Sequence, residues 1–383
     1  MNNDKDQHCI SFLLKIIEKK PKTGSLLRTT ATLLLFAGIL SSTTVAQQDI
    51  PFANNRQVRV LTRNTYHGVD AEFSAAAASS TFPQLLARVA AVYNGYIARD
   101  FPARAELMAA EIEATRPDLI GLQEAVLVRT GLLFNPAPAE TVALDYVQIL
   151  IDALAARGLQ YTVVVQSIGF DIEAPSALGF DVRHTDREVI LARSDLTTAD
   201  LKLSNRQAGH FAVNCTIPGG IVGRITILRG WVSVDAKIRG KSFRVVSTHL
   251  DGDCLPFTSA IQNAQAAELM AGPLSTELSL VLLGDLNSPA DGTGGVYNSL
   301  IASGFADTWS AAGIGSGFTC CQAGNLLNPV STLGRRIDVV LTRNGLETLS
   351  ATVVGDNPAI RTPFGLWPSD HAGVAAVLKL PQN

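Results

Sequence analysis

Eight polar side chains stand nearly all at the ends of predicted strands, and their types suit cation binding and proton transfer. The apolar run at residues 280–283, for example, stops at Gly284 and is followed by Asp285 and Asn287. A strand that ends in Gly-Asp is often only a turn capped by the carboxylate, so a single such position is weak evidence. Carboxylates and carboxamides are ligands for hard cations, and imidazole exchanges protons near neutral pH. The eight residues are Asn64, Glu124, His249, Asp285, Asn287, Asp338, Asp370 and His371.

Short apolar stretches that alternate with helical stretches are expected to position these residues. Because strand ends meet at the rim of a sheet, the alternation predicts an α/β fold with the polar residues at one edge. Residues 169–183 are expected to form a loop. Helices are predicted at residues 82–96, 103–115, 145–157 and 259–270. Strands are predicted at residues 58–64, 118–124, 161–166, 188–193, 225–234, 241–250, 279–284, 336–342 and 372–380.

The N-terminal segment differs from the rest of the chain. Basic residues from Lys15 to Arg28 precede an apolar core at residues 32–40 and the ending Thr44-Val-Ala46. This order predicts a cleaved secretory signal peptide at residues 1–46, whose core is too short to span a bilayer. The long basic part leaves an uncleaved N-terminus as the alternative. Residues 47–57 are expected to be a linker and residues 58–381 a single domain, secreted or periplasmic, with no stable membrane span.

Composition and charge limit the classes of protein. The chain of 383 residues is 47% hydrophobic and 17% charged, which is typical of a folded globule with a large core. Loss of residues 1–46 would remove six Lys/Arg and three Asp/Glu and change the net charge from −3 to −6. Such a chain does not hold nucleic acid by bulk charge, although the net charge does not exclude a local basic groove.

Four cysteines remain in the expected mature chain, and they predict one or two disulfides in an exported protein. The adjacent Cys320 and Cys321 are expected to reach out to Cys215 and Cys254, because a bond between neighbours is strained. Zinc is not expected, because Cys-x-x-Cys spacing is missing and no histidine stands nearby in the sequence.

The ordered set of polar residues resembles the endonuclease/exonuclease/phosphatase superfamily, to which deoxyribonuclease I, neutral sphingomyelinases and inositol polyphosphate phosphatases belong. Any one of its motifs is weak, whereas all six in the family's order across residues 58–380 are a strong signal. The resemblance implies a four-layer α/β sandwich in which two packed, mostly antiparallel or mixed sheets are flanked by helices. The matching motifs are Thr62-Arg-Asn64, Leu122-Gln-Glu124, Ser247-Thr-His-Leu250, Gly284-Asp-Leu-Asn287, Arg336-Ile-Asp338 and Ser369-Asp-His371.

The resemblance also implies a divalent metal ion and roles in phosphodiester hydrolysis. Glu124 would bind Mg²⁺, or alternatively Mn²⁺ or Ca²⁺, with Asn64 and Asp370 as further ligands. His249 and His371 would act as an acid/base pair and as charge partners of the phosphate.

The other motif residues would support this chemistry. Asp338 would hold His371, Asp285 would orient or deprotonate the attacking water, and Asn287 would donate to the phosphate. The base is either His249 or Asp285. The acid partner of His249 is either Asp186 or Glu188.

Substrate choice is expected to depend on the long segments after Asn64 and Glu124, unless these only extend the helical layer. The sequence predicts a monomeric, exported phosphodiesterase that acts as a nonspecific endonuclease. The first alternative is a sphingomyelinase or phospholipase C type enzyme, which apolar residues 364–367 beside the last motif would suit unless Trp367 packs in the core. The second alternative is a catalytically inactive binding member of the family, which the complete motif set disfavours.

Overall fold

The computed structural model describes residues 56–252 and 254–382. The predicted signal peptide and residues 47–55 of the predicted linker lie outside the described residues. Among the described helices, none is both long and apolar enough to cross a membrane.

Two mixed sheets form the centre of the fold. The first has the order β15-β16-β1-β2-β6-β3-β4, with β5 paired to β6, and the second has the order β13-β14-β12-β11-β10-β7. In the first sheet the strands are β1 Gln57–Asn64, β2 Leu119–Gln123, β3 Leu127–Leu132, β4 Thr141–Asp145, β5 Tyr161–Pro175, β6 Phe180–Arg193, β15 Glu347–Val354 and β16 Gly373–Lys379. In the second they are β7 Lys202–His210, β10 Gly230–Ile238, β11 Lys241–His249, β12 Ser279–Asp285, β13 Ala306–Asp307 and β14 Asp338–Arg343.

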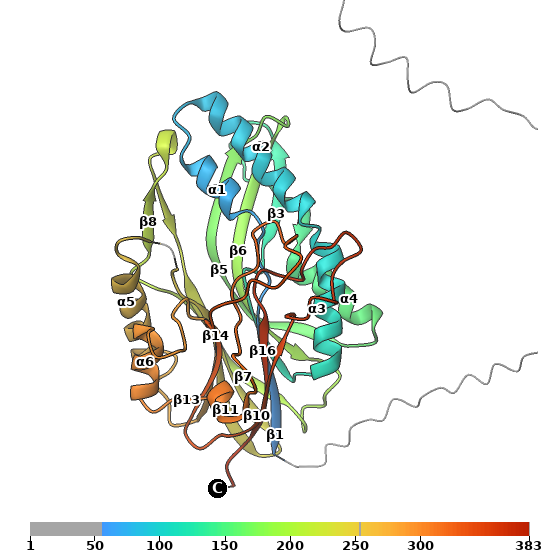
Figure 1. Cartoon of the computed structure of the whole chain (residues 1–383), viewed down its shortest axis with the longest axis vertical. Helices are drawn as coiled ribbons and strands as arrows, with labels where there is room; N and C mark the ends of the chain where they lie inside the picture. Colours follow the sequence, from blue (N-terminus) through green and yellow to red (C-terminus); the bar gives the residue numbers. More distant parts are fainter. Residues whose placement is uncertain (1–55, 253, 383) are drawn as a thin grey trace, which may run out of the picture. The chain divides into compact units, whose positions relative to one another are not determined.

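Helices cover the outer face of each sheet (Figure 1). Apolar side chains of α2, α3 and α4 pack with those of the first sheet in one buried cluster, and those of α5 and α6 pack with the second sheet in another. The helices are α1 Asp70–Ala77, α2 Phe82–Ala98, α3 Phe101–Thr115, α4 Tyr146–Ala156, α5 Thr258–Ala271, α6 Gly295–Ala302 and α7 Thr308–Ala312.

A third apolar cluster lies between the two sheets. Val60 of β1 and Ile190 of β6 pack there with Val245 of β11, Val281 of β12 and Val340 of β14, and all five are fully buried. Branched apolar side chains of this kind suit the inner faces of packed sheets. The predicted α/β sandwich of two sheets flanked by helices is therefore confirmed.

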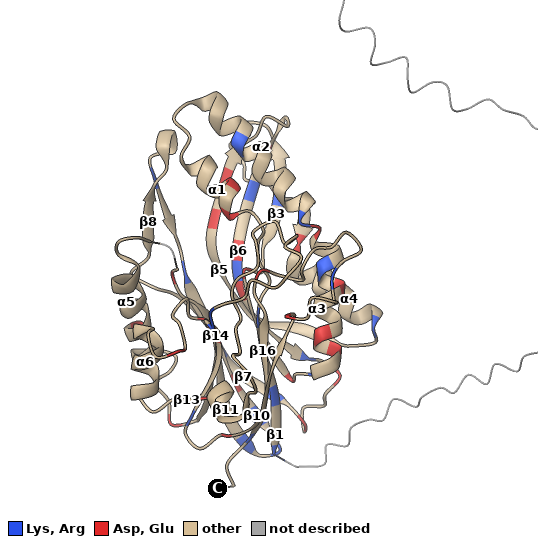
Figure 2. Ribbon diagram, viewed as in Figure 1, with Lys and Arg blue, Asp and Glu red and all other residues tan. Residues whose placement is uncertain are grey.

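The predicted loop at residues 169–183 is wrong, because these residues extend β5 and β6 into a long hairpin. Its register is held by polar pairs: Arg183 bonds to Asp171 at 2.6 Å, and Thr185 donates to Asp171 at 2.7 Å. Figure 2 shows the charged residues along both strands. Cross-strand polar pairs stabilise a hairpin without the apolar alternation on which strand prediction relies.

The predicted strand at residues 225–234 is interrupted. Its first part belongs to a separate hairpin of β8 Cys215–Pro218 and β9 Arg224–Ile227, and β10 begins only at Gly230. The interruption matters for the site, because Arg229 lies in it.

The predicted cysteine pairing is wrong. Cys215 is bonded to Cys254, with 5.7 Å between their Cα atoms, and Cys320 is bonded to Cys321. Cys215 at the start of β8 and Cys254 after β11 share a small apolar cluster with Ile261, which explains their pairing. The two adjacent cysteines lie elsewhere in the fold, where the backbone of Cys320 forms an isolated antiparallel β-bridge with the backbone of His371.

Candidate active site

Sheet register brings the predicted residues to one rim. Parallel pairing of β11 with β12 sets His249 opposite Asp285, and antiparallel pairing of β12 with β14 sets Asp285 opposite Asp338. In the other sheet, β1 and β2 run parallel with Asn64 opposite Gln123, so Asn64 and the next residue, Glu124, lie at the same end. The two sheets thus present their polar strand ends to each other.

Asp285 connects the two halves of this rim. Its Oδ2 lies 3.2 Å from Asn64 Nδ2, 3.6 Å from His249 Nε2 and 3.7 Å from His371 Nδ1. Its Oδ1 accepts a hydrogen bond from the backbone N–H of Asn287 at 2.8 Å. Burial, and then the charge of Asp338, raise the pKa of Asp285 to about 6.

His371 is held as a cation. Its Nδ1 lies 2.8 Å from Oδ2 of the fully buried Asp338, whose backbone N–H donates to Thr319 Oγ1 at 3.1 Å. Burial by itself lowers the pKa of His371, but Asp338 and Asp370 outweigh it and raise the pKa well above its usual value. The structure therefore joins His371 with Asp338 as the sequence predicted.

His249 is held in its neutral form. Arg229 donates from Nη1 to His249 Nδ1 at 2.8 Å, so the ring proton belongs on Nε2, which faces Asp285. Burial, and then the charge of Arg229, lower the pKa of His249 well below its usual value. Asn287 completes the surroundings, because its Nδ2 lies 3.2 Å from His249 Nε2 and 3.0 Å from the carbonyl of Leu250.

Both predicted acid partners lie near His249, but in different ways. Glu188 Oε1 is 3.8 Å from His249 Nδ1, whereas Asp186 Oδ2 is 3.3 Å from Arg229 Nη1. Burial, and then the neighbouring Asp186, raise the pKa of Glu188 well above its usual value. Glu188 is thus the direct neighbour of the histidine, and Asp186 acts on it only through Arg229.

Glu124 is the centre of the candidate metal-binding residues. Its Oε1 accepts from Asn64 Nδ2 at 3.1 Å, and its Oε2 accepts from the backbone N–H of His67 at 2.8 Å. The amide oxygen of Asn64 accepts from the backbone N–H of Tyr66 at 2.9 Å, so Asn64 presents its nitrogen to the carboxylates. In this arrangement Asn64 orients Glu124 and Asp285, while its predicted role as an oxygen ligand stays a prediction.

Asp370 has the features of a carboxylate prepared for a cation. Its Oδ1 is buried without a hydrogen-bond partner. Burial, and then the charges of Glu124 and Asp70, raise its pKa to about 7, against the opposing effect of His371. Two carboxylates that repel each other and a buried oxygen without a partner fit a hard divalent ion. The candidate residues therefore suit the predicted metal.

Three residues of the site were not predicted from the sequence: Arg229, His67 and Asp70. His67 Nε2 lies 3.0 Å from Asp70 Oδ1 and 3.7 Å from Glu124 Oε2. Burial lowers the pKa of His67, but Asp70 and Glu124 outweigh it and raise the pKa to about 10. The position of His67 three residues beyond Asn64, at the same strand end, was the available signal.

Comparisons with known proteins agree with this fold. A family model described as the endonuclease/exonuclease/phosphatase family matches residues 92–371. No curated protein matches the chain. A family protein from Bacteroides thetaiotaomicron has a similar structure, with a TM-score of 0.53, 14% identity and coverage of 85% of this chain and 98% of its own. A family protein from Leptotrichia buccalis has a TM-score of 0.52, 16% identity and coverage of 84% and 100%. A mannosyl-6-phosphatase from Bacteroides thetaiotaomicron has a TM-score of 0.50, 15% identity and coverage of 84% and 99%.

Proposed function

We infer that this chain, which belongs to the endonuclease/exonuclease/phosphatase family, hydrolyses phosphodiesters with the help of a divalent metal ion. The observation that carries the inference is the position of Asp285. One carboxylate contacts Asn64 on the metal-binding side and lies within 3.7 Å of ring nitrogens of both His249 and His371. Phosphoryl transfer needs an activated water, charge stabilisation and a proton donor close together, and this arrangement supplies groups for each.

Glu124, Asp370 and Asn64 would hold the metal, which we take to be Mg²⁺, with Mn²⁺ or Ca²⁺ as alternatives. A bound ion of this kind neutralises charge that develops on the phosphoryl oxygens. The orphaned Oδ1 of Asp370 and the fixed carboxylate of Glu124 support this assignment.

The residues of the second sheet would carry out proton transfer and anion binding. His371, held as a cation by Asp338, contacts the phosphate and is suited to protonate the leaving oxygen. Asp285 orients the attacking water and is the favoured base of the two predicted candidates, because Nδ1 of His249 already accepts from Arg229 and Nε2 carries the ring proton. Asn287, whose amide group lies beside His249, donates to a phosphoryl oxygen.

Nucleic acid is the proposed substrate class, as the sequence predicted. Arg229 supports it, because a cation beside His249 provides local attraction that the overall acidic charge does not. The lipid alternative loses one argument, because Trp367 is fully buried and donates from Nε1 to the carbonyl of Asn328. Phe364 keeps it open, because 79% of its surface is exposed.

Export is the proposed location. The Cys215–Cys254 disulfide supports an oxidising compartment, since such bonds form and persist outside the cytosol. We also propose that the exported chain is a monomer.

The test is an assay of the purified chain with Mg²⁺, Mn²⁺, Ca²⁺ or EDTA against four substrates. These are plasmid DNA, RNA, sphingomyelin liposomes and a bis-aryl phosphate. We expect metal-dependent cleavage of nucleic acid and of the bis-aryl phosphate. Cleavage of sphingomyelin alone would replace the nuclease by a lipid phosphodiesterase, and no cleavage of any substrate would favour an inactive binding protein.

A further inference from the structure

The segment of residues 319–322 connects the loop that carries His371 with the segment that leads into Asp338 at the start of β14. Backbone N–H groups of Thr319 and Cys320 donate to the carbonyl of Arg335, and the N–H of Arg335 donates back to Cys320. On the other side, the backbone N–H of Ala372 donates to the carbonyl of Thr319, and the backbone of Cys320 forms an isolated antiparallel β-bridge with that of His371. The bonded cysteines are therefore part of the site's framework.

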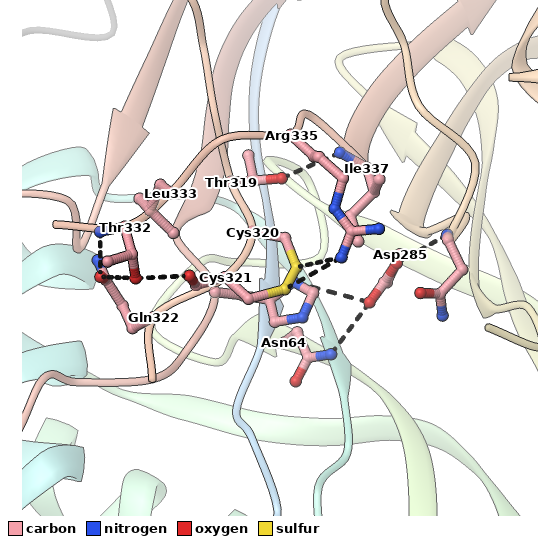
Figure 3. The surroundings of a disulfide bond; sticks show 12 residues. Asn64, Asp285, Thr319, Cys320, Cys321, Gln322, Thr332, Leu333, Arg335 and Ile337 are labelled. Carbon is pink, nitrogen blue, oxygen red and sulfur yellow. Dashed lines mark hydrogen bonds and ion pairs between the residues drawn. A yellow bond between two sulfur atoms is a disulfide. The ribbon is translucent and has the colours of Figure 1, made fainter. Parts of the chain in front are cut away.

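The two sulfur atoms also face the site. Figure 3 shows Cys320 and Cys321 beside Arg335, with Asn64 and Asp285 nearby. One ligand atom from each of Cys320, Cys321 and His371 lies within 4.8 Å of the other two. Cys320 is buried and Cys321 is half-buried, so Cys321 gives a reagent access to the bond.

We propose that Cys320, Cys321 and His371 form a second metal site, which binds a thiophilic ion such as Zn²⁺ once the Cys320–Cys321 bond is reduced. Two thiolates and an imidazole are ligands that Zn²⁺ prefers over Mg²⁺, and three protein ligands leave a position for water. The sequence argued against zinc because no histidine stands near the cysteines along the chain. The fold brings His371 close to Cys320 and Cys321 in space.

His371 is well oriented for this role. Asp338 occupies its Nδ1, so Nε2 is the nitrogen that the ion would use, and a carboxylate behind a metal-binding histidine strengthens the ligand. An ion at this position would remove His371 from catalysis. This consequence rests on the proposed function, whereas the binding itself does not.

The chemistry of the reduction is balanced by a named reductant. A phosphine breaks the S–S bond, gives up two electrons and becomes its oxide with oxygen from water, whose two protons pass to the two thiols. Binding of Zn²⁺ then releases those two protons to solvent.

The binding test compares the phosphine-reduced, oxygen-free full chain with the equally reduced Cys320→Ser/Cys321→Ser variant, using Zn²⁺ alone as the probe and a competing chelator indicator. All other cysteines and the Mg²⁺ ligands are common to both proteins. We expect one additional Zn²⁺ per wild-type chain, and binding weakened at least about 10-fold by His371→Asn. Equal zinc stoichiometry in the two proteins, or unchanged affinity in His371→Asn, would overturn the site.

Two further measurements distinguish loss of the zinc site from misfolding of a variant and from failure of the proposed function. Co²⁺ should give thiolate charge-transfer absorption in the reduced wild type only, and Cys321→Ser, checked by circular dichroism, should also lose it. Zn²⁺ should inhibit the reduced wild type at least about 10-fold more than the reduced double variant. Equal inhibition would contradict the regulatory consequence. If no substrate is hydrolysed by either protein, the proposed function fails while the zinc stoichiometry still decides the site.

Discussion

In the proposed mechanism Asp285 carries the most demanding role of any single residue, because its carboxylate lies close to both histidines and to Asn64. Asp285→Asn keeps the shape but removes the charge, so we expect kcat to fall by about 10³-fold with the fold intact. Asp291→Asn is the matched control, because Asp291 lies exposed in the next loop and only caps Thr293. Steady-state kinetics on a bis-aryl phosphate measure both. A loss of less than tenfold in Asp285→Asn would remove the residue from the chemistry.

At this scale the sequence was most informative where a polar residue stands at one end of an apolar run. Asp285 ends such a run and Asp338 begins one, and antiparallel register sets the two opposite each other. Arg229 was not predictable, because it stands inside the predicted strand at residues 225–234 and not at its end. Contacts with His249 and with Asp186, which stands 43 residues earlier in the chain, make it part of the site.

At the scale of elements, the loop after β11 fixes the position of Asn287. A Cβ atom added at Gly252 would lie 2.7–2.9 Å from the Asn287 side chain, closer than packing permits. Gly252→Ala should therefore displace Asn287 from His249 and reduce kcat at least about 10-fold. Gly295→Ala at the start of α6 is the control, because its nearest neighbour would be 3.8 Å away. Unchanged kcat in Gly252→Ala would show that Asn287 need not be held in place.

Helix α3 supports the site from behind β1. Glu111 forms a buried ion pair with Arg63 at 2.9 Å, and Arg63 in turn donates to the backbone carbonyl of His371. Glu111→Gln leaves the arginine charge buried without its counterion, so we expect the free energy of unfolding to fall by about 3 kcal/mol.

The control for this prediction lies two residues further along the helix. Glu113 pairs with Arg157 at the surface, so Glu113→Gln should change the free energy of unfolding by less than about 1 kcal/mol. Urea denaturation measures both variants. Equal effects would mean that the buried pair adds nothing beyond a surface pair.

Elements were predictable where their stabilisation comes from apolar burial. The buried strand β12 and helices α2 and α3 were predicted from such patterns. The outer half of the β5–β6 hairpin was not, because pairs such as Arg183 with Asp171 stabilise it, and their partners cannot be recognised before the strands are paired. The cysteine pairing failed for the same reason, since it depends on which loops the fold brings together.

At the scale of the whole molecule, the buried carboxylates make stability depend on pH. The pKa of Asp370 is raised to about 7 from 3.8, mainly by burial, so ionising it opposes folding. The penalty is absent below the unfolded pKa of 3.8, grows as pH rises from there to about 7, and is complete above it. Asp370→Asn should therefore raise the Tm of the metal-free chain at about pH 8, with the gain shrinking toward about pH 4.

Mg²⁺ provides the second half of that experiment. At about pH 8 it should raise the Tm of the wild type more than that of Asp370→Asn, because the variant lacks a ligand. Thermal unfolding followed by circular dichroism measures both. A gain in Asp370→Asn that is equal at both pH values would contradict the electrostatic cause.

The metal requirement of hydrolysis by wild type and Glu124→Gln tests the central claim most directly. The measurement is the rate of bis-aryl phosphate cleavage against Mg²⁺ concentration, with Glu140→Gln, an exposed carboxylate, as control. We predict no wild-type activity in EDTA, full recovery with Mg²⁺, and a loss of at least about 10²-fold in Glu124→Gln. Activity that persists in EDTA, or a Glu124→Gln variant with the wild-type Mg²⁺ dependence, would contradict the account.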